Sequence, residues 1–97
     1  MKAVFISYNQ ALTDRINTML DTLGIRGFTK WALTEGRGSY DGEPHYGTHA
    51  WPSMNASVLA IVEDEKVDPL LAALRETDAQ TKMQGLRAFV WNVEQSM

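Results

Sequence analysis

Apolar residues between positions 9 and 24 recur at the spacing of an α-helix that buries one face. The members of this stripe are Leu12, Ile16, Met19, Leu20 and Leu23. Asn9 precedes the stripe and is a suitable N-cap residue. Gly24 follows it and suits the left-handed position at which many helices end. The sequence therefore predicts a first helix between Asn9 and Gly24.

A second stripe of helical period lies in residues 64–77. Its members are Val67, Leu70, Leu71 and Leu74. The acidic residues 63–65 suit a helix N-terminus, where the helix dipole favours negative charge. Pro69 has no amide hydrogen, so it fits either in the first turn of a helix or as the first helical residue after an Asp68 cap. The pattern predicts a second amphipathic helix with Pro69 in one of these two positions.

Four short segments rich in β-branched and aromatic residues predict strands. They are residues 3–8, 28–35, 57–62 and 86–93. With the two helices between them, the order is β-α-β-β-α-β, the ferredoxin-like pattern. The predicted fold class is α+β, with a four-stranded antiparallel sheet, both helices on one face, and a long loop between the second and third strands. A chain of 97 residues forms a single domain, residues 1–97.

The predicted strands are apolar on both sides, as the runs AVFI, VLAIV and AFVW show. Because the helices cover one face of the sheet, the other face would expose an apolar patch that soluble monomers rarely tolerate. We expect further copies of the same chain to cover it in a closed homo-oligomer. Trp31 and Trp91 lie within strands, and we interpret them as core or subunit contacts.

Charge and composition exclude several classes of function. With a net charge of -3 and scattered Lys and Arg, the chain has no basic stripe of the kind that binds nucleic acid or anionic lipid. The absence of cysteine excludes disulfides, thiolate catalysis and cysteine zinc sites. No apolar run reaches the length of a signal-peptide core or a membrane span. We therefore expect a cytoplasmic protein that does not insert into membranes.

Residues 36–52, GRGSYDGEPHYGTHAWP, follow neither the helical nor the strand period. Unpatterned segments longer than roughly 12 residues are usually functional or disordered. We therefore expect residues 37–54 to form a mobile loop. At its start, Gly36 and Gly38 are suited to bring backbone amides close to a phosphate, and Arg37 is suited to pair with an anion. The alternative is that these residues simply end a strand.

His45 and His49 are the side chains of this loop that favour transition metals, and Asp41 and Glu43 lie close by in sequence. A closed homo-oligomer would bring several such sets together. The i, i+4 spacing places both histidines on one side only in a helix, which Pro44 opposes. A transition-metal site and two exposed histidines without a ligand are both open interpretations.

Three aromatic residues of the same loop, Tyr40, Tyr46 and Trp51, are of the types that dominate protein interfaces. We expect Trp51 and Pro52 to anchor the base of the loop, and residues 39–47 to move and to contact a partner protein. Both histidines of the chain lie in this loop, so the sequence offers no fixed set of nucleophile, base and orienting group. We therefore expect no enzymatic activity.

Four segments resemble the PII-like signalling superfamily, the trimeric ferredoxin-like proteins that include the nitrogen-regulatory PII proteins and the CutA-type proteins. TEGRG at 34–38 resembles the family's strand-ending Gly-x-Gly, and a long loop follows it. VEDEKVDPLLAAL at 62–74 is similar to the passage into the second helix, and GLRAFVWNVEQ at 85–95 is similar to the last strand. These segments follow the family's order and span nearly the whole chain.

The resemblance implies a homotrimeric regulatory protein with ligand clefts between neighbouring subunits. It implies that an effector, an adenine nucleotide or another anion, binds near Thr29, Gly36, Arg37, Gly38, Gly85 and Arg87. It also implies that the loop reshapes when the effector binds and contacts a regulated partner, which is a membrane transporter for several members.

Two departures from the classical members weaken the expectation of tight ATP binding. Those members have a Gly-Asp-Gly-Lys-like turn before the last strand and basic residues after it. This chain has KMQGLRA at 82–88 and ends at Met97, with Lys82, Gly85 and Arg87 as partial substitutes. The loop resembles those of PII-like variants, so the resemblance does not extend to sensing of glutamine or oxoglutarate.

Two alternative functions stay open at this point. The first is a CutA-like metal-binding protein of metal tolerance or efflux regulation, with His45 and His49 as ligands. The second is a scaffold whose trimer presents the loop with no effector at all.

Overall fold

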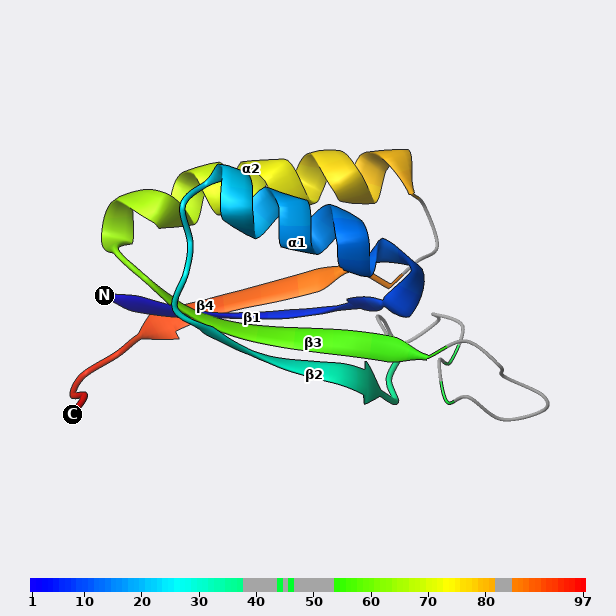
Figure 1. Ribbon diagram of the computed structural model, residues 1–97, viewed down its shortest axis with the longest axis horizontal. Coiled ribbons are helices and arrows are strands. Elements are labelled where there is room, and N and C mark those ends of the chain that lie inside the picture. Colours follow the sequence, from blue (N-terminus) through cyan, green and yellow to red (C-terminus); the bar gives the residue numbers. More distant parts are fainter. Residues whose placement is uncertain (38–43, 45, 47–53, 82–84) are drawn as a thin grey trace.

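The computed structural model describes residues 1–37, 44, 46, 54–81 and 85–97. The elements in chain order are β1 (Lys2–Asn9), the 3-10 turn η1 (Gln10–Leu12), α1 (Thr13–Thr22), β2 (Phe28–Thr34), β3 (Asn55–Val62), α2 (Asp64–Gln80) and β4 (Arg87–Asn92). The sheet has the order β2-β3-β1-β4, and all neighbouring strands are antiparallel. Both helices lie on one side of the sheet (Figure 1). The predicted α+β, ferredoxin-like fold is confirmed.

The core lies between the sheet and the two helices. Alternate residues of β1 and β3 point into it, because the register pairs Val4 with Ala60 and Ile6 with Val58. The helices supply the apolar stripes that the sequence predicted, and their buried members are Ile16, Leu20, Leu70 and Leu74. Burial and close packing of these apolar side chains stabilise the layer.

The first helix begins and ends as predicted. The side chain of Asn9 accepts a hydrogen bond from the Ala11 amide at 2.9 Å, which caps η1 at the entry to α1. Gly24 has a φ of 70°, the left-handed conformation that glycine adopts without strain at a helix C-terminus. Lys66 Nζ donates to the carbonyl of Leu23 at 2.7 Å and so satisfies a free acceptor at that end.

The start of the second helix differs from both sequence interpretations of Pro69. Glu63 is the N-cap and α2 begins at Asp64, so Pro69 lies inside the helix, beyond its first turn. The acidic residues 63–65 therefore lie at the helix N-terminus, where the helix dipole favours negative charge. Because proline has no amide hydrogen, α2 lacks the hydrogen bond that residue 69 would otherwise donate to the carbonyl of residue 65.

Neither helix in the described part of the chain is long and apolar enough to cross a membrane.

Tyr8 is the largest fully buried side chain, and its hydroxyl forms no hydrogen bond within the described residues. Burial raises the pKa of Tyr8, and the nearby Thr13 hydroxyl opposes part of that rise. Thr13 Oγ1 itself pairs with the carbonyl of Gln10, at 2.7 Å. The Tyr8 ring therefore fills core volume while its hydroxyl contributes a desolvation cost.

Tyr8→Phe is expected to leave the free energy of unfolding unchanged or to raise it by about 1 kcal/mol, because the ring stays and the unpaired hydroxyl goes. Tyr8→Ala, which also empties the core, is expected to lose about 3–5 kcal/mol. Chemical denaturation of the three proteins would measure both effects. A loss of stability in Tyr8→Phe as large as that of an ordinary buried hydrogen bond would show that the hydroxyl has a partner.

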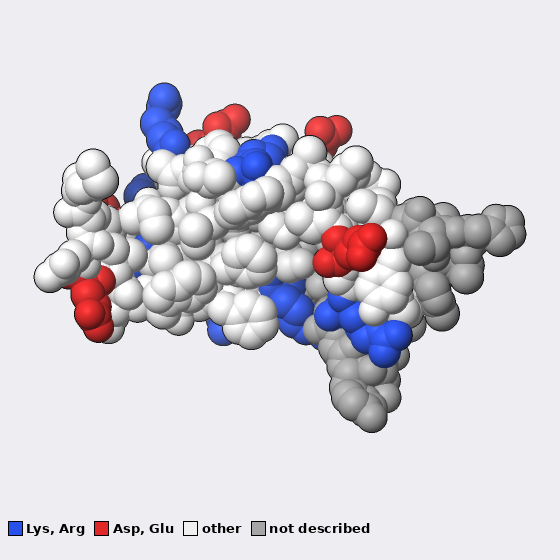
Figure 2. All heavy atoms as spheres, turned by 90° about the horizontal axis from the view of Figure 1, so that it is seen from below, with Lys and Arg blue, Asp and Glu red and all other residues white. Residues whose placement is uncertain are grey.

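The face of the sheet opposite the helices is apolar over most of its area. Five residues that we call the open face lie there by register: Phe5, Leu59, Ile61, Phe89 and Trp91. Phe89 keeps 59% and Trp91 keeps 50% of its surface exposed. Uncharged side chains cover most of this side of the molecule, and Lys and Arg reach it mainly toward the end where β2 ends and β3 begins (Figure 2). The predicted apolar patch is therefore present.

Candidate functional site

A line of polar side chains crosses the sheet on the same side as the open face, at the end where β2 ends and β3 begins. Its members, which we call the polar strip, are Thr34 of β2, Asn55 and Ser57 of β3, Ser7 of β1 and Arg87 of β4. The register pairs Ser57 with Ser7 and Ser7 with Arg87, and it pairs Thr34 with Asn55. Directly opposed residues of antiparallel strands point to the same face, so the strip is continuous.

Hydrogen bonds between neighbouring strands hold the middle of the strip. Asn55 Nδ2 donates to Ser7 Oγ at 3.4 Å, and the hydroxyls of Thr34 and Ser57 lie 3.2 Å apart. Asn55 is 2% exposed and Ser57 is 4% exposed, so these polar groups are already withdrawn from water in a single chain. Buried polar groups that pair with each other fix side-chain positions more firmly than apolar contacts do.

Gly36 lies against the strip at the end of β2. A Cβ atom at this position would come within 2.6 Å of Asn55 Nδ2, which is closer than real contacts allow. Glycine therefore lets the chain pass directly over the Asn55 side chain. The sequence offered phosphate binding or a simple strand end as reasons for this glycine, and the structure adds a third reason in the packing of Asn55. The exposed side chain of Arg37 follows at once.

The opposite end of the strip is formed by the start of β4. Gly85 has a φ of 69°, so the chain enters β4 through a left-handed residue that favours glycine. Arg87 is exposed, and its Nη1 donates to the carbonyl of Leu86 at 2.7 Å. That bond uses one of the five donors of the guanidinium group. Within the described residues Arg87 forms no ion pair, although Asp78 of α2 lines the same hollow, so the guanidinium keeps donors for an anion at the β4 end of the strip.

The structure separates the predicted effector residues into two groups on opposite edge strands. Gly36 and Arg37 follow β2, and Gly85 and Arg87 belong to the start of β4, with β3 and β1 between them. Adjacent strands lie about 4.8 Å apart, which puts roughly 14 Å between the two edges. Thr29 pairs with Leu59 in the apolar part of the face and is outside the strip. Within one chain, the polar strip is the connection between the two groups.

Sequence reasoning missed the four residues in the middle of the site, Ser7, Thr34, Asn55 and Ser57. Ser7, Thr34 and Ser57 were interpreted as ordinary strand residues, and Asn55 fell between the expected loop, which ended at residue 54, and the expected strand, which began at residue 57. Their common position depends on the register of three strand pairs, which the sequence of one strand does not contain. The available signal was weak: polar residues at the ends of otherwise apolar strands.

Several predicted site residues lie outside the described part of the chain: Gly38, Tyr40, His45, His49 and Trp51. Among the residues that the structure describes, no group of three or more His, Asp or Glu side chains is placed to hold a metal ion.

Tyr46 is the one loop aromatic that the structure describes, and it forms an isolated antiparallel bridge with Met54. The Met54 carbonyl in turn accepts a hydrogen bond from the Gln10 amide at 2.9 Å. Tyr46 therefore lies near the start of β3, and the mobility of residues 39–47 stays a prediction.

Comparisons with known proteins agree with this fold. The family model described as nitrogen regulatory protein P-II matches residues 1–97. Comparison with curated protein sequences found no match.

Among solved structures, the chain is similar to CPII of Thiomonas intermedia K12, a nitrogen regulatory PII-like protein bound to ADP, AMP and bicarbonate. The TM-score is 0.74 at 23% identity, over 93% of this chain and 82% of that one. It is also similar to a protein of Thermus thermophilus designated a PII-like signaling protein. That TM-score is 0.69 at 27% identity, over 95% of this chain and 85% of that one.

Proposed function

The chain belongs to the nitrogen regulatory protein P-II family, and from that premise we propose that it is a homotrimeric, cytoplasmic regulator that binds an adenine nucleotide at the polar strip. The nucleotide controls how residues 37–54 fit a partner protein, for which a membrane transporter is the candidate. The family is one of regulatory, signalling proteins, and the proposal assigns this chain no catalytic step.

The observation that supports the proposal best is the polar strip itself. It joins Gly36 to Arg87 across a face that is otherwise apolar, and it ends in a positive charge with no carboxylate partner among the described residues. An arginine flanked by hydroxyl and amide groups is suited to a phosphate, because guanidinium pairs with phosphate through two parallel hydrogen bonds. The similar structure of CPII was obtained with ADP and AMP bound.

A homotrimer explains how the two edge groups serve one ligand. The open face has to be covered, and copies of the chain around a threefold axis cover it with identical surfaces. In such a ring, the β2 edge of one copy is brought next to the β4 edge of its neighbour. Arg37 of one copy and Arg87 of the next are then available to the same phosphate groups.

Control of a partner then follows as a shift between two states of the segment after Gly36. A nucleotide shifts that equilibrium only as far as it binds one state more tightly than the other. Contacts from Arg37 at the start of the segment would supply this difference, because they form only when the segment is placed over the strip.

A thermal-shift panel with ADP, AMP, ATP, bicarbonate, copper and zinc tests the proposal. A ligand that binds only the native protein stabilises it by about 2.7 kcal/mol at a concentration 100 times its dissociation constant, so ADP or AMP is expected to raise the melting temperature by several degrees. A response to copper or zinc without any response to nucleotides would favour a CutA-like metal-binding function instead. No response to any of these ligands would favour a scaffold without an effector.

A further inference from the structure

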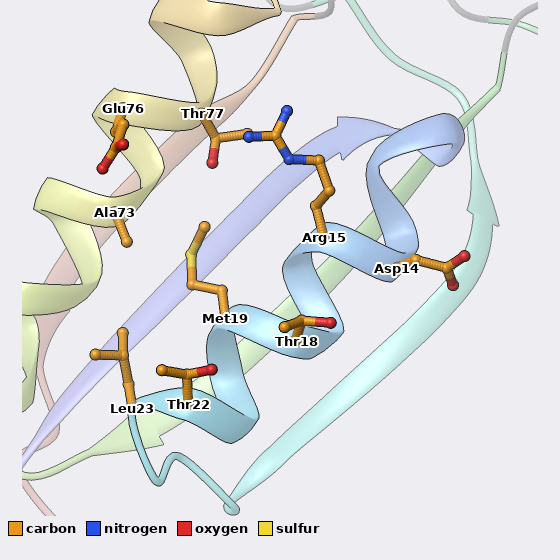
Figure 3. A pocket seen from close by; sticks show the side chains of 9 residues that line it. All are labelled: Asp14, Arg15, Thr18, Met19, Thr22, Leu23, Ala73, Glu76 and Thr77. Atoms are coloured by element: carbon orange, nitrogen blue, oxygen red, sulfur yellow. The ribbon is translucent and has the colours of Figure 1, made fainter.

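A groove separates the two helices on the outer surface of the helix layer (Figure 3). Its volume is about 480 Å³. Met19 of α1 and Ala73 of α2 face each other across it, and Leu23 closes the apolar floor at one end. Thr18, Thr22 and Thr77 also line the groove. The groove therefore has an apolar floor and lies on the opposite side of the sheet from the polar strip.

The helix layer around this groove is strongly acidic. Residues 10–24 and 63–81 contain Asp14, Asp21, Glu63, Asp64, Glu65, Asp68, Glu76 and Asp78, against Arg15, Lys66 and Arg75. The rest of the chain has the opposite balance, with four acidic and six basic residues. Asp14 and Glu76 are themselves groove residues. The net negative charge of the chain therefore comes from the two helical segments.

These acidic groups are largely uncompensated within the chain. In the described ranges, the ion pair formed by this layer joins Asp64 to the Met1 amine at 2.6 Å, and Asp14 and Glu76 form none. Arg15 is the basic residue among those that line the groove, and its guanidinium donates to Gln80 Oε1 at 2.6 Å across the gap between the helices. Its guanidinium reaches across the groove and lies beside Thr77 of α2 (Figure 3), so it closes one end of the groove and forms no ion pair with Asp14 or Glu76.

We propose that the groove between α1 and α2 is a docking site for a basic, amphipathic helical segment of a partner protein. A helix laid along the groove would place apolar side chains at i, i+3 and i+4 on the floor around Met19 and Ala73. The flexible thioether of Met19 adapts to different apolar side chains. Lys and Arg on the flanks of the segment would meet the acidic groove residues Asp14 and Glu76, which favour such a partner and disfavour acidic segments, anionic lipid and nucleic acid.

This site is independent of the proposed effector site. The groove lies outside the helix layer, whereas the polar strip lies on the other face of the sheet, and the two share no residue. A partner docked here would meet the trimer at its periphery while the segment after Gly36 contacts it elsewhere. Cytoplasmic loops of membrane proteins are rich in Lys and Arg, so a transporter partner fits the required chemistry.

Binding of two synthetic helical peptides tests the proposal. One peptide has leucine at i, i+3, i+4 and i+7 and lysine at its exposed positions, and the other has glutamate in place of every lysine. Fluorescence anisotropy with the full chain at physiological salt would measure both affinities. The lysine peptide is expected to bind at least about tenfold more tightly. Equal affinities, or no binding of the lysine peptide, would overturn the proposal.

A matched pair of variants separates the groove from the general field of the acidic layer. Ala73→Arg fills the groove and Ala79→Arg places the same charge on an exposed position of α2 outside it. Ala73→Arg is expected to weaken binding of the lysine peptide at least about tenfold, and Ala79→Arg at most about twofold. Equal losses would show attraction by charge alone and would overturn the docking site. If circular dichroism shows that Ala73→Arg is unfolded, Thr22→Arg takes its place, because Thr22 is an exposed residue of α1 that also lines the groove.

Discussion

Phe89→Asp is expected to convert the proposed homotrimer into single chains that remain folded. Phe89 lies on the open face opposite Phe5 and keeps 59% of its surface exposed in the isolated chain, so aspartate there leaves the core between sheet and helices intact. In the trimer the same position is covered by neighbouring copies, and the carboxylate would be buried without a partner. A buried charge without a partner costs about 3–5 kcal/mol, and the trimer would contain three such sites.

Sedimentation equilibrium at micromolar concentration would measure the effect, with circular dichroism to confirm that the variant is folded. Ala79→Asp, on the exposed side of α2, adds the same charge away from the open face and is expected to leave the assembly intact. A well-folded monomer in the unsubstituted protein would contradict the covered open face, and so would a trimer of Phe89→Asp. Either result would also remove the argument that two copies share the effector site.

The open face was predictable from sequence because it follows from a local property. Strands that are apolar at both odd and even positions have two apolar faces whichever neighbours they pair with, and two helices cover only one of them. The runs around Phe5, Leu59 and Phe89 therefore indicated the patch before their register was known. The helix between Asn9 and Gly24 was predictable for the same reason, since its stripe and both of its end signals lie within a few residues of each other.

The features that sequence reasoning missed depend on contacts between distant segments. Asn55 has low strand propensity, and the third strand was predicted to begin only at residue 57. In the structure β3 begins at Asn55, whose side chain is buried beside Ser7 and against Gly36. Pro69 disfavours the position it occupies, and the helix nevertheless extends back to Asp64 because its apolar face packs on the sheet. In both cases tertiary packing overrides the local preference.

Arg87→Ala is expected to abolish the stabilisation of the protein by ADP. Arg87 is the charged end of the polar strip, and within the described residues it forms no ion pair. A hydrogen bond to a charged group contributes about 1.5–3 kcal/mol, so its loss raises the dissociation constant roughly 10- to 100-fold. At an ADP concentration that shifts the unsubstituted protein by several degrees, the variant should show little or no shift. Isothermal titration calorimetry would measure the change in affinity directly.

Two further variants distinguish a phosphate contact from a general effect of charge. Arg87→Lys keeps the charge but loses the paired geometry of the guanidinium, so it is expected to retain part of the ADP response. Arg15→Ala removes the same charge from α1, on the opposite side of the sheet, and should bind ADP as the unsubstituted protein does. If Arg15→Ala weakened ADP binding as much as Arg87→Ala, the nucleotide would be responding to net charge and not to the strip. If Arg87→Ala bound ADP normally, the effector site would have to lie elsewhere in the assembly.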